Sequence, residues 1–136
     1  MYRRGISYLL IGVVMIGILL VCGCTQSASP SQEAVSAANV TADRVLQSLN
    51  DGNYISFSTN FSGVMLQGIN QSRFDGLRND ILTKYGNYTS KSSTQALVVG
   101  GDNVFIYDCQ FEKGKLQFQF SINSTDMSTV TGLYYK

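Results

Sequence analysis

The chain has 136 residues, with ten Lys and Arg against nine Asp and Glu, a formal net charge of +1 and no histidine. This near balance of charge excludes the basic footprint of a nucleic-acid-binding protein, so we predict no nucleic acid partner. The lack of histidine excludes Ser-His and Cys-His nucleophile pairs.

The first 23 residues have the three-part layout of a secretory signal peptide. Arg3 and Arg4 form a basic start, and an apolar segment follows from Leu9 to Val21. The paired arginines alone also allow a twin-arginine signal. The uncharged stretch that ends at Gly23 is long enough, at about 18 residues or more, to remain as an uncleaved membrane anchor. Both interpretations place the rest of the chain outside the cytoplasm, because the arginines favour the cytoplasmic side.

Cys24 is the predicted lipid anchor. Lipidation requires a thiol that can form a thioether with diacylglycerol, next to a small residue at which a peptidase can cleave, and Gly23-Cys24 meets both demands. Two acyl chains give a stable anchor, which a single chain does not. The alternative is an ordinary apolar cysteine, which can then form a disulfide with Cys109. We therefore expect an extracytoplasmic protein anchored to the cell membrane through lipid or through an N-terminal helix.

Beyond the leader we expect a flexible tether over residues 24–32 and one domain over residues 33–136. The tether is rich in Ser, Ala and Gln and contains the chain's only proline, Pro30. Without Arg3 and Arg4, eight basic residues remain against nine acidic ones, a net charge near −1. The mature part is therefore nearly neutral.

The N-terminal half of this domain predicts helices. From Ser31 onward, apolar residues recur every three or four positions up to Leu49, and Gly52 ends this first helix. Ser31 or Thr41 is the expected N-cap, because a side-chain oxygen there can accept a free amide of the first turn.

Two further helices are expected. Ser62 is placed to cap a short one. Ser72 stands three residues before Asp75, a variant of the capping box, and predicts the start of a longer helix that ends at Gly86.

The apolar period changes from about 3.6 to 2 in the C-terminal half, which predicts strands. Alternation runs from Phe105 to Phe111, then from Leu116 to Ile122 after a turn at Lys113-Gly114. Val98-Val99 and a last segment from Met127 or Ser128 to Tyr135 complete about four antiparallel strands. The fold class is therefore α+β, with the helices on one face of the sheet.

Two short stretches and three phenylalanines resemble the pattern of a secreted family called domain of unknown function 3887. The stretches are Leu49-Asn50-Asp51-Gly52-Asn53-Tyr54 and Gly86-Asn87-Tyr88, and the phenylalanines are Phe57, Phe61 and Phe74. The resemblance covers residues 34–136. It implies an NTF2-like or cystatin-like fold, in which N-terminal helices pack on a strongly curved antiparallel sheet to form a cone. It also implies a lipoprotein or a module attached to other domains, and it implies no activity.

A curved sheet of this kind can leave a cavity lined by aromatic residues. The alternative is that the same side chains fill the core of a small domain, as large aromatic residues usually do. The candidates for this lining are Tyr54, Phe57, Phe61, Phe74, Phe105, Tyr107, Phe118, Phe120 and Tyr134.

We expect no catalytic residue, metal or cofactor. Asp108 lies in an apolar strand, but alternation places it on the face opposite Tyr107 and Cys109, so we expect it in solvent. Cys109 is expected to point inward as a small core residue. Asp102-Asn103, after Gly100-Gly101, supplies too few acids for a calcium loop, so we predict a hairpin turn.

Five Asn-x-Ser/Thr triplets are acceptor candidates for glycans in an organism that glycosylates its surface proteins. Asn87 and Asn123 are the favoured ones because we expect both at turns. The other triplets begin at Asn39, Asn60 and Asn70.

Two functions remain open. One is a membrane-tethered, non-catalytic binding or interaction module of the cell envelope, and the other is a small-molecule enzyme built in an NTF2-like cavity. The outer face of the sheet can also dock an envelope protein or a second copy of the chain, through Lys115, Gln117, Gln119 and Ser121.

Overall fold

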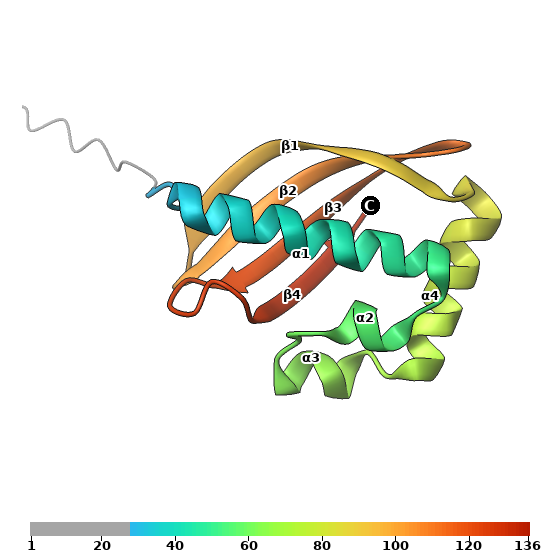
Figure 1. Cartoon of the computed structure of the whole chain (residues 1–136), viewed down its shortest axis with the longest axis horizontal. Coiled ribbons are helices and arrows are strands. Elements are labelled where there is room, and N and C mark those ends of the chain that lie inside the picture. The colour runs from blue at the N-terminus through green and yellow to red at the C-terminus, as the bar shows by residue number, and fades with distance from the viewer. Residues whose placement is uncertain (1–27) are drawn as a thin grey trace, which may run out of the picture.

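A computed structural model describes residues 28–136. The signal peptide, the anchor Cys24 and most of the predicted tether lie outside the described residues. No helix of the described part is both long enough and apolar enough to cross a membrane. Four helices precede four strands (Figure 1): α1 (Gln32–Asp51), α2 (Tyr54–Ser58), α3 (Gly63–Gly68), α4 (Gln71–Tyr85), β1 (Tyr88–Val99), β2 (Asp102–Phe111), β3 (Gly114–Asn123) and β4 (Val130–Tyr135).

Helix α1 has the predicted cap and stop. The Ser31 hydroxyl accepts a hydrogen bond from the Ala34 amide at 3.1 Å, so the helix begins at Gln32, which the sequence places in the tether. Gly52 ends the helix in the left-handed conformation, with φ of 68°, which glycine adopts without a steric penalty. Thr41 lies inside the helix and is buried.

The remaining helices are also capped by side chains. Ser62 caps α3 as predicted, accepting from the Met65 amide. The prediction for α4 is wrong, because Asn70 and not Ser72 caps it, accepting from the Arg73 amide at 3.0 Å. Helix α2 was not expected, since five residues are too few to show a helical period.

The strands form one antiparallel sheet in the order β1-β2-β3-β4, which confirms the α+β prediction. Gly100 and Gly101, both at positive φ, join β1 to β2, so this segment is the hairpin turn expected from the sequence. The sequence predicts the first strand only at Val98-Val99, but β1 begins ten residues before Val98, at Tyr88. The added residues are rich in Ser and Thr and show no apolar alternation. Figure 1 shows the sheet bending along its strands.

Each of three bulges in this sheet places a threonine opposite no partner. The pairing register shifts at Thr89 and Thr94 in β1 and at Thr131 in β4. The hydroxyl groups of Thr89 and Thr94 donate to the carbonyls of Gln110 and Ile106 on β2, each at 3.0 Å. Because a bulge bends a strand and increases its twist, each of these three positions contributes to the curvature.

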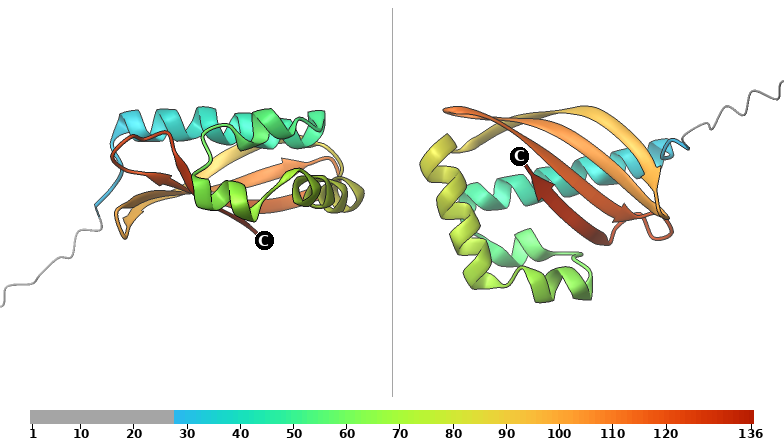
Figure 2. Two further views of the ribbon diagram at one scale, coloured as in Figure 1. Left: turned by 90° about the horizontal axis from the view of Figure 1, so that it is seen from below. Right: turned by 180° about the vertical axis from the view of Figure 1, so that it is seen from behind.

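The helices cover one face and one end of the sheet (Figure 2), with α1 lying across the face. Between them lies the core, and most of its large side chains are less than 2% exposed. The core side chains come from α1, α2, α4 and the inner faces of the strands, and include Val45, Leu46, Leu49, Phe57, Phe74, Ile81, Phe105, Tyr107, Phe111, Phe118, Phe120 and Ile122.

The helix layer is joined to the sheet by Asn50, near the end of α1. Its side chain accepts a hydrogen bond from the Tyr88 amide at 2.8 Å and donates one to the Tyr88 carbonyl at 2.9 Å. It therefore binds the free edge of β1 as a neighbouring strand would. Arg78 of α4 donates to the carbonyls of Leu49 and Asn50, at 2.7 and 3.0 Å, and so satisfies the C-terminal carbonyls of α1.

The Asn50→Ala variant tests this junction. We expect it to lower the free energy of unfolding by about 2–3 kcal/mol, because two hydrogen bonds are lost and the Tyr88 backbone groups lose their partners. Urea denaturation measures the change. Asn79→Ala, at an exposed position of α4, is the matched control with an expected change of about 0.5 kcal/mol or less. Equal effects of the two variants would contradict the assignment.

Candidate functional site

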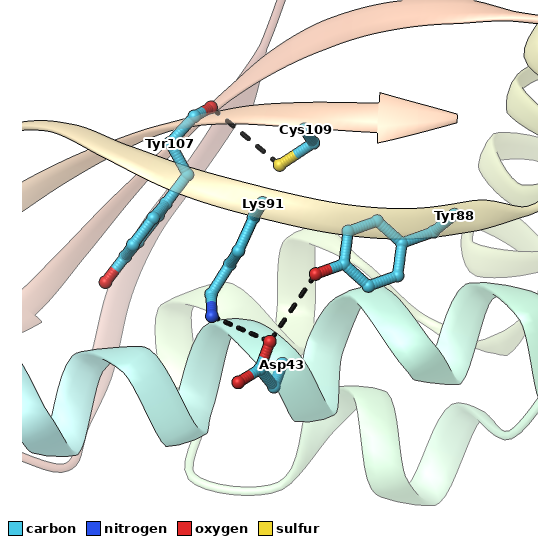
Figure 3. Close-up of polar contacts among 5 residues, drawn as sticks. All are labelled: Asp43, Tyr88, Lys91, Tyr107 and Cys109. Carbon is cyan, nitrogen blue, oxygen red and sulfur yellow. Dashed lines mark hydrogen bonds and ion pairs between the residues drawn. The ribbon is translucent and has the colours of Figure 1, made fainter. Parts of the chain in front are cut away.

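A polar cluster lies between α1 and the inner face of the sheet. It contains Asp43 of α1, Tyr88 and Lys91 of β1, and Tyr107 and Cys109 of β2 (Figure 3). These five residues bring together a carboxylate, an ammonium group, two phenols and a thiol. Their geometry decides whether the cluster can act on a substrate.

Lys91 points inward because of its register. It pairs opposite Cys109, on the inner face, and its side chain is only 11% exposed. Its ammonium lies 2.7 Å from the Asp43 carboxylate, which is itself 60% exposed at the margin of α1. The Tyr88 hydroxyl donates to the same carboxylate oxygen at 3.4 Å. The positive charge is therefore already neutralised within the fold, and the Lys91 ammonium also lies 5.4 Å from the centre of the Tyr107 ring.

Tyr107 and Cys109 are fully buried. Burial raises the pKa of the Tyr107 hydroxyl to about 12, with a further contribution from the negative charge of Asp43. Burial likewise raises the pKa of the Cys109 thiol to about 12, although nearby Lys91 opposes this. Both groups are therefore protonated at neutral pH, and Cys109 is not a thiolate nucleophile. The Tyr107 hydroxyl has no hydrogen-bond partner within residues 28–136.

The cluster is not arranged as a metal centre. Within residues 28–136 no three His, Cys, Asp or Glu side chains lie close enough together to hold a metal ion. Asp43 and Lys91 form an ion pair, while Tyr107 and Cys109 are neutral. The arrangement is that of a half-buried structural contact between α1 and β1.

Eight of the nine predicted pocket residues lie in the core or against it. Tyr54 packs at its margin and donates its hydroxyl to the Ile69 carbonyl at 2.9 Å. Tyr134 is different: it is 60% exposed and pairs with Gln119 on the outer face. The bulge at Thr131 reverses the alternation of β4, so Tyr135 and not Tyr134 stacks on Phe118.

A pocket of about 220 Å³ lies elsewhere, between α4 and the adjoining parts of β3 and β4. None of the nine predicted lining residues contributes to it. The sequence signal that could have found it is the set of tyrosines and lysines near the ends of α4 and β4. The lining residues are Asp80, Ile81, Lys84, Tyr85, Leu116, Tyr135 and Lys136.

Asp108 and the two favoured glycosylation candidates lie outside the core. Asp108 is exposed and accepts a hydrogen bond from the side-chain amide of Gln117 at 2.9 Å, so it is not a buried carboxyl group. Asn87 is exposed beside Glu112, whereas Asn123 is half-buried and its side-chain oxygen accepts from the Thr125 amide at 2.8 Å. Asn87 is therefore the more exposed of the two, although its side-chain nitrogen donates to Glu112 at 3.5 Å.

Comparison with known families gives one match. Residues 42–132 match the family model described as protein of unknown function (DUF3887). No curated protein and no solved structure matches the chain. The matched range contains both stretches on which the resemblance in the sequence rests, and these stretches meet in the structure where Asn50 binds Tyr88.

Removing one partner of the ion pair tests its structural role. Asp43→Ala leaves the Lys91 ammonium mostly buried and unpaired, so we expect the free energy of unfolding to fall by about 1–3 kcal/mol. Lys91→Met keeps the apolar stem and removes the charge, so we expect a change of about 1 kcal/mol or less. Denaturant unfolding of both variants and of the double variant measures the coupling. A larger loss in Lys91→Met than in Asp43→Ala would contradict this account.

Alkaline pH tests the burial of Cys109. Burial raises the pKa of the thiol to about 12 in the folded protein, against an ordinary value of 9.0. The contribution of the protonated thiol to the free energy of unfolding is therefore complete below pH 9 and is lost as the pH rises toward 12. We expect the free energy of unfolding to fall above pH 9 in the presence of reductant. The fall should be smaller in Cys109→Ala. Identical pH dependence of the two proteins would show that the thiol is not buried.

Proposed function

The chain belongs to the family of proteins of unknown function DUF3887, and from this premise we propose that it is a membrane-anchored extracytoplasmic lipoprotein that acts as a non-catalytic binding or interaction module. The observation that carries the non-catalytic part is the filled inner face of the sheet. The place where an NTF2-like cavity is expected is occupied by packed aromatic side chains, including Phe57, Phe74, Phe105 and Phe118.

The chemistry of the inner cluster supports the same proposal. A general acid or base needs a pKa near the working pH and access to its substrate. The pKa values of Tyr107 and Cys109 are raised to about 12, and both side chains are fully buried. Lys91 is paired with Asp43 at 2.7 Å. The Tyr107 hydroxyl and the Cys109 thiol are therefore not poised to exchange a proton at neutral pH.

The start of the described chain supports a short membrane tether. The Ala28 carbonyl accepts a hydrogen bond from the Val98 amide at 3.1 Å, which fixes the chain beside the β1–β2 hairpin. Cys24 stands four residues earlier, a reach of about 15 Å at most. With Cys24 in the membrane, the end of the domain that carries this hairpin and the β3–β4 loop faces the lipid. Helix α4 lies at the opposite end (Figure 1).

One observation favours the alternative of a small-molecule enzyme. The buried Tyr107 hydroxyl has no hydrogen-bond partner among the described residues, and the Lys91 ammonium lies 5.4 Å from the centre of the same ring, so a polar ligand admitted beneath α1 would find a donor there. A small molecule retained by the protein in native mass spectrometry and lost in Tyr107→Phe would support this alternative. A retained second copy of the chain would instead support an interaction module.

The Cys24→Ala variant tests the anchor. We expect the wild-type chain, purified from its own membranes, to begin at Cys24 and to carry the mass of a diacylglyceryl group. The variant should lack that mass and should either leave the membrane or remain as an uncleaved precursor, because no thioether can form. Intact-mass analysis and membrane fractionation measure both properties.

Cys22→Ala is the matched control, since it leaves the predicted lipid site intact and should be processed as the wild type. The same unlipidated mass for the wild type and Cys24→Ala would contradict the lipoprotein proposal. If the wild type and Cys24→Ala both stay in the membrane with the leader attached, the anchor is an uncleaved helix.

A further inference from the structure

We infer that the pocket between α4, β3 and β4 binds a small ligand in which an anionic group, a carboxylate or a phosphate, is attached to a ring, as in an acidic sugar. This inference names the ligand class of the proposed binding module and rests on that proposal. It is carried by the shape of the pocket, by two lysines without acidic partners and by two fixed tyrosine rings.

The size of the pocket limits the ligand. Its volume of about 220 Å³ lies below the range of about 300–1,000 Å³ that is typical of sites for drug-sized molecules. It corresponds to about seven water molecules of liquid volume. A single ring with its substituents is therefore the size of group that it admits, either free or at the end of a longer molecule.

The charge of the pocket favours an anion. Lys84 comes from the last turn of α4, and Lys136 follows β4, where its backbone pairs with Gln117. Within residues 28–136 the only ion pair is that of Lys91 with Asp43, so neither lining lysine forms an ion pair. Two lysines against the single acid Asp80 leave an excess of positive charge among the lining residues, which favours a carboxylate or phosphate.

Further positive charge lies at the same end of the domain. Lys113 and Lys115 belong to the β2–β3 hairpin, which is held to the end of α4 by a hydrogen bond from the Lys113 amide to the Tyr85 carbonyl at 2.8 Å. Four of the five lysines in the described part therefore surround this end. Lys113 and Lys115 add positive charge near the pocket, beside Glu112 of the same hairpin, while Lys84 and Lys136 line it.

The two tyrosines supply fixed ring surfaces. Tyr135 is 38% exposed and stacks on the buried ring of Phe118, with ring centroids 5.6 Å apart. Tyr85 packs against Phe111, and the absence of a side chain at Gly114 leaves room for it, since a Cβ there would lie 3.1 Å from its ring. Rings held in this way offer flat contact area without a further loss of side-chain entropy.

Asp80 adds the complementary polar group. It is the only acidic residue that lines the pocket, and its carboxylate can accept hydrogen bonds from hydroxyl groups of the ligand. A pocket with two cations, one acceptor and two rings matches a hydroxylated ring that carries an acid. A purely apolar ligand would leave all three charged groups without a partner.

The position of the pocket separates this ligand from the anchoring membrane. The pocket lies at the α4 end of the domain, while Ala28 and the β1–β2 hairpin lie at the other end (Figure 1). With Cys24 as the anchor, the pocket faces away from the lipid that holds the protein. Its ligand is therefore an acidic sugar, free or part of an envelope polymer, and not a headgroup of the same membrane.

The test uses the full-length chain in nonionic detergent, titrated with glucuronate, glucose 6-phosphate and glucose by isothermal calorimetry. We expect one or both anionic probes to bind and glucose to bind about fivefold more weakly or worse, because it lacks the charge. Added salt should weaken the binding of the anions. Equal binding of glucose and the better anionic probe, or no binding of any probe, would overturn the inference.

Matched double variants locate the binding. Lys84→Gln with Lys136→Gln should weaken the binding of the anionic probe about fivefold or more, whereas Lys113→Gln with Lys115→Gln should weaken it by about twofold or less. Unfolding midpoints equal to that of the wild type show that both variants fold. An equal loss in the two double variants would overturn the assignment to this pocket. Lipidation of Cys24 is measured separately, so the failure of either proposal is distinguishable from that of the other.

Discussion

The side-chain amide of Asn50 binds the backbone of Tyr88 in place of a neighbouring strand, and this contact joins the helices of the domain to its sheet. Tyr88 opens the edge strand β1, and its own amide and carbonyl would otherwise be free to pair with another chain. The same contact fixes the end of α1, because Arg78 of α4 binds the carbonyl of Asn50 itself. One residue therefore sets the relative position of α1, α4 and β1, and with it the packing of the aromatic core beneath α1.

The same corner gives a role to several residues of the stretch on which the resemblance to the family rests. Within the stretch from Leu49 to Tyr54, Leu49 is buried in the core, Asn50 binds β1, Gly52 ends α1 and Asn53 caps α2. Each of these roles is structural. The contacts of these residues therefore build the corner between the helices and the sheet. The groups available for binding lie elsewhere, at the end of the domain formed by α4 and the adjoining parts of β3 and β4.

The sequence predicts the regular parts of this fold well. The apolar spacing of α1, its cap at Ser31 and the alternation of β2 and β3 reflect local rules, and the outward position of Asp108 follows from them. The bulges could not be predicted, because one unpaired residue leaves no mark in the Ser- and Thr-rich sequence of β1 or in the six residues of β4. The bulge at Thr131 turns Tyr134 outward. The inner polar cluster and the pocket at α4 depend on contacts between distant segments, which the apolar periods along the chain do not encode.

Native-state hydrogen exchange of the Tyr88 amide, measured by NMR, tests the central claim most directly. If the Asn50 contact holds the helix layer to the sheet, this amide should exchange only through global unfolding, with a free energy close to that of the most protected amides in β2 and β3. Its protection should fall in Asn50→Ala together with that of the C-terminal turns of α1. Rapid exchange of the Tyr88 amide by local fraying of β1, with the centre of the sheet still protected, would contradict the claim.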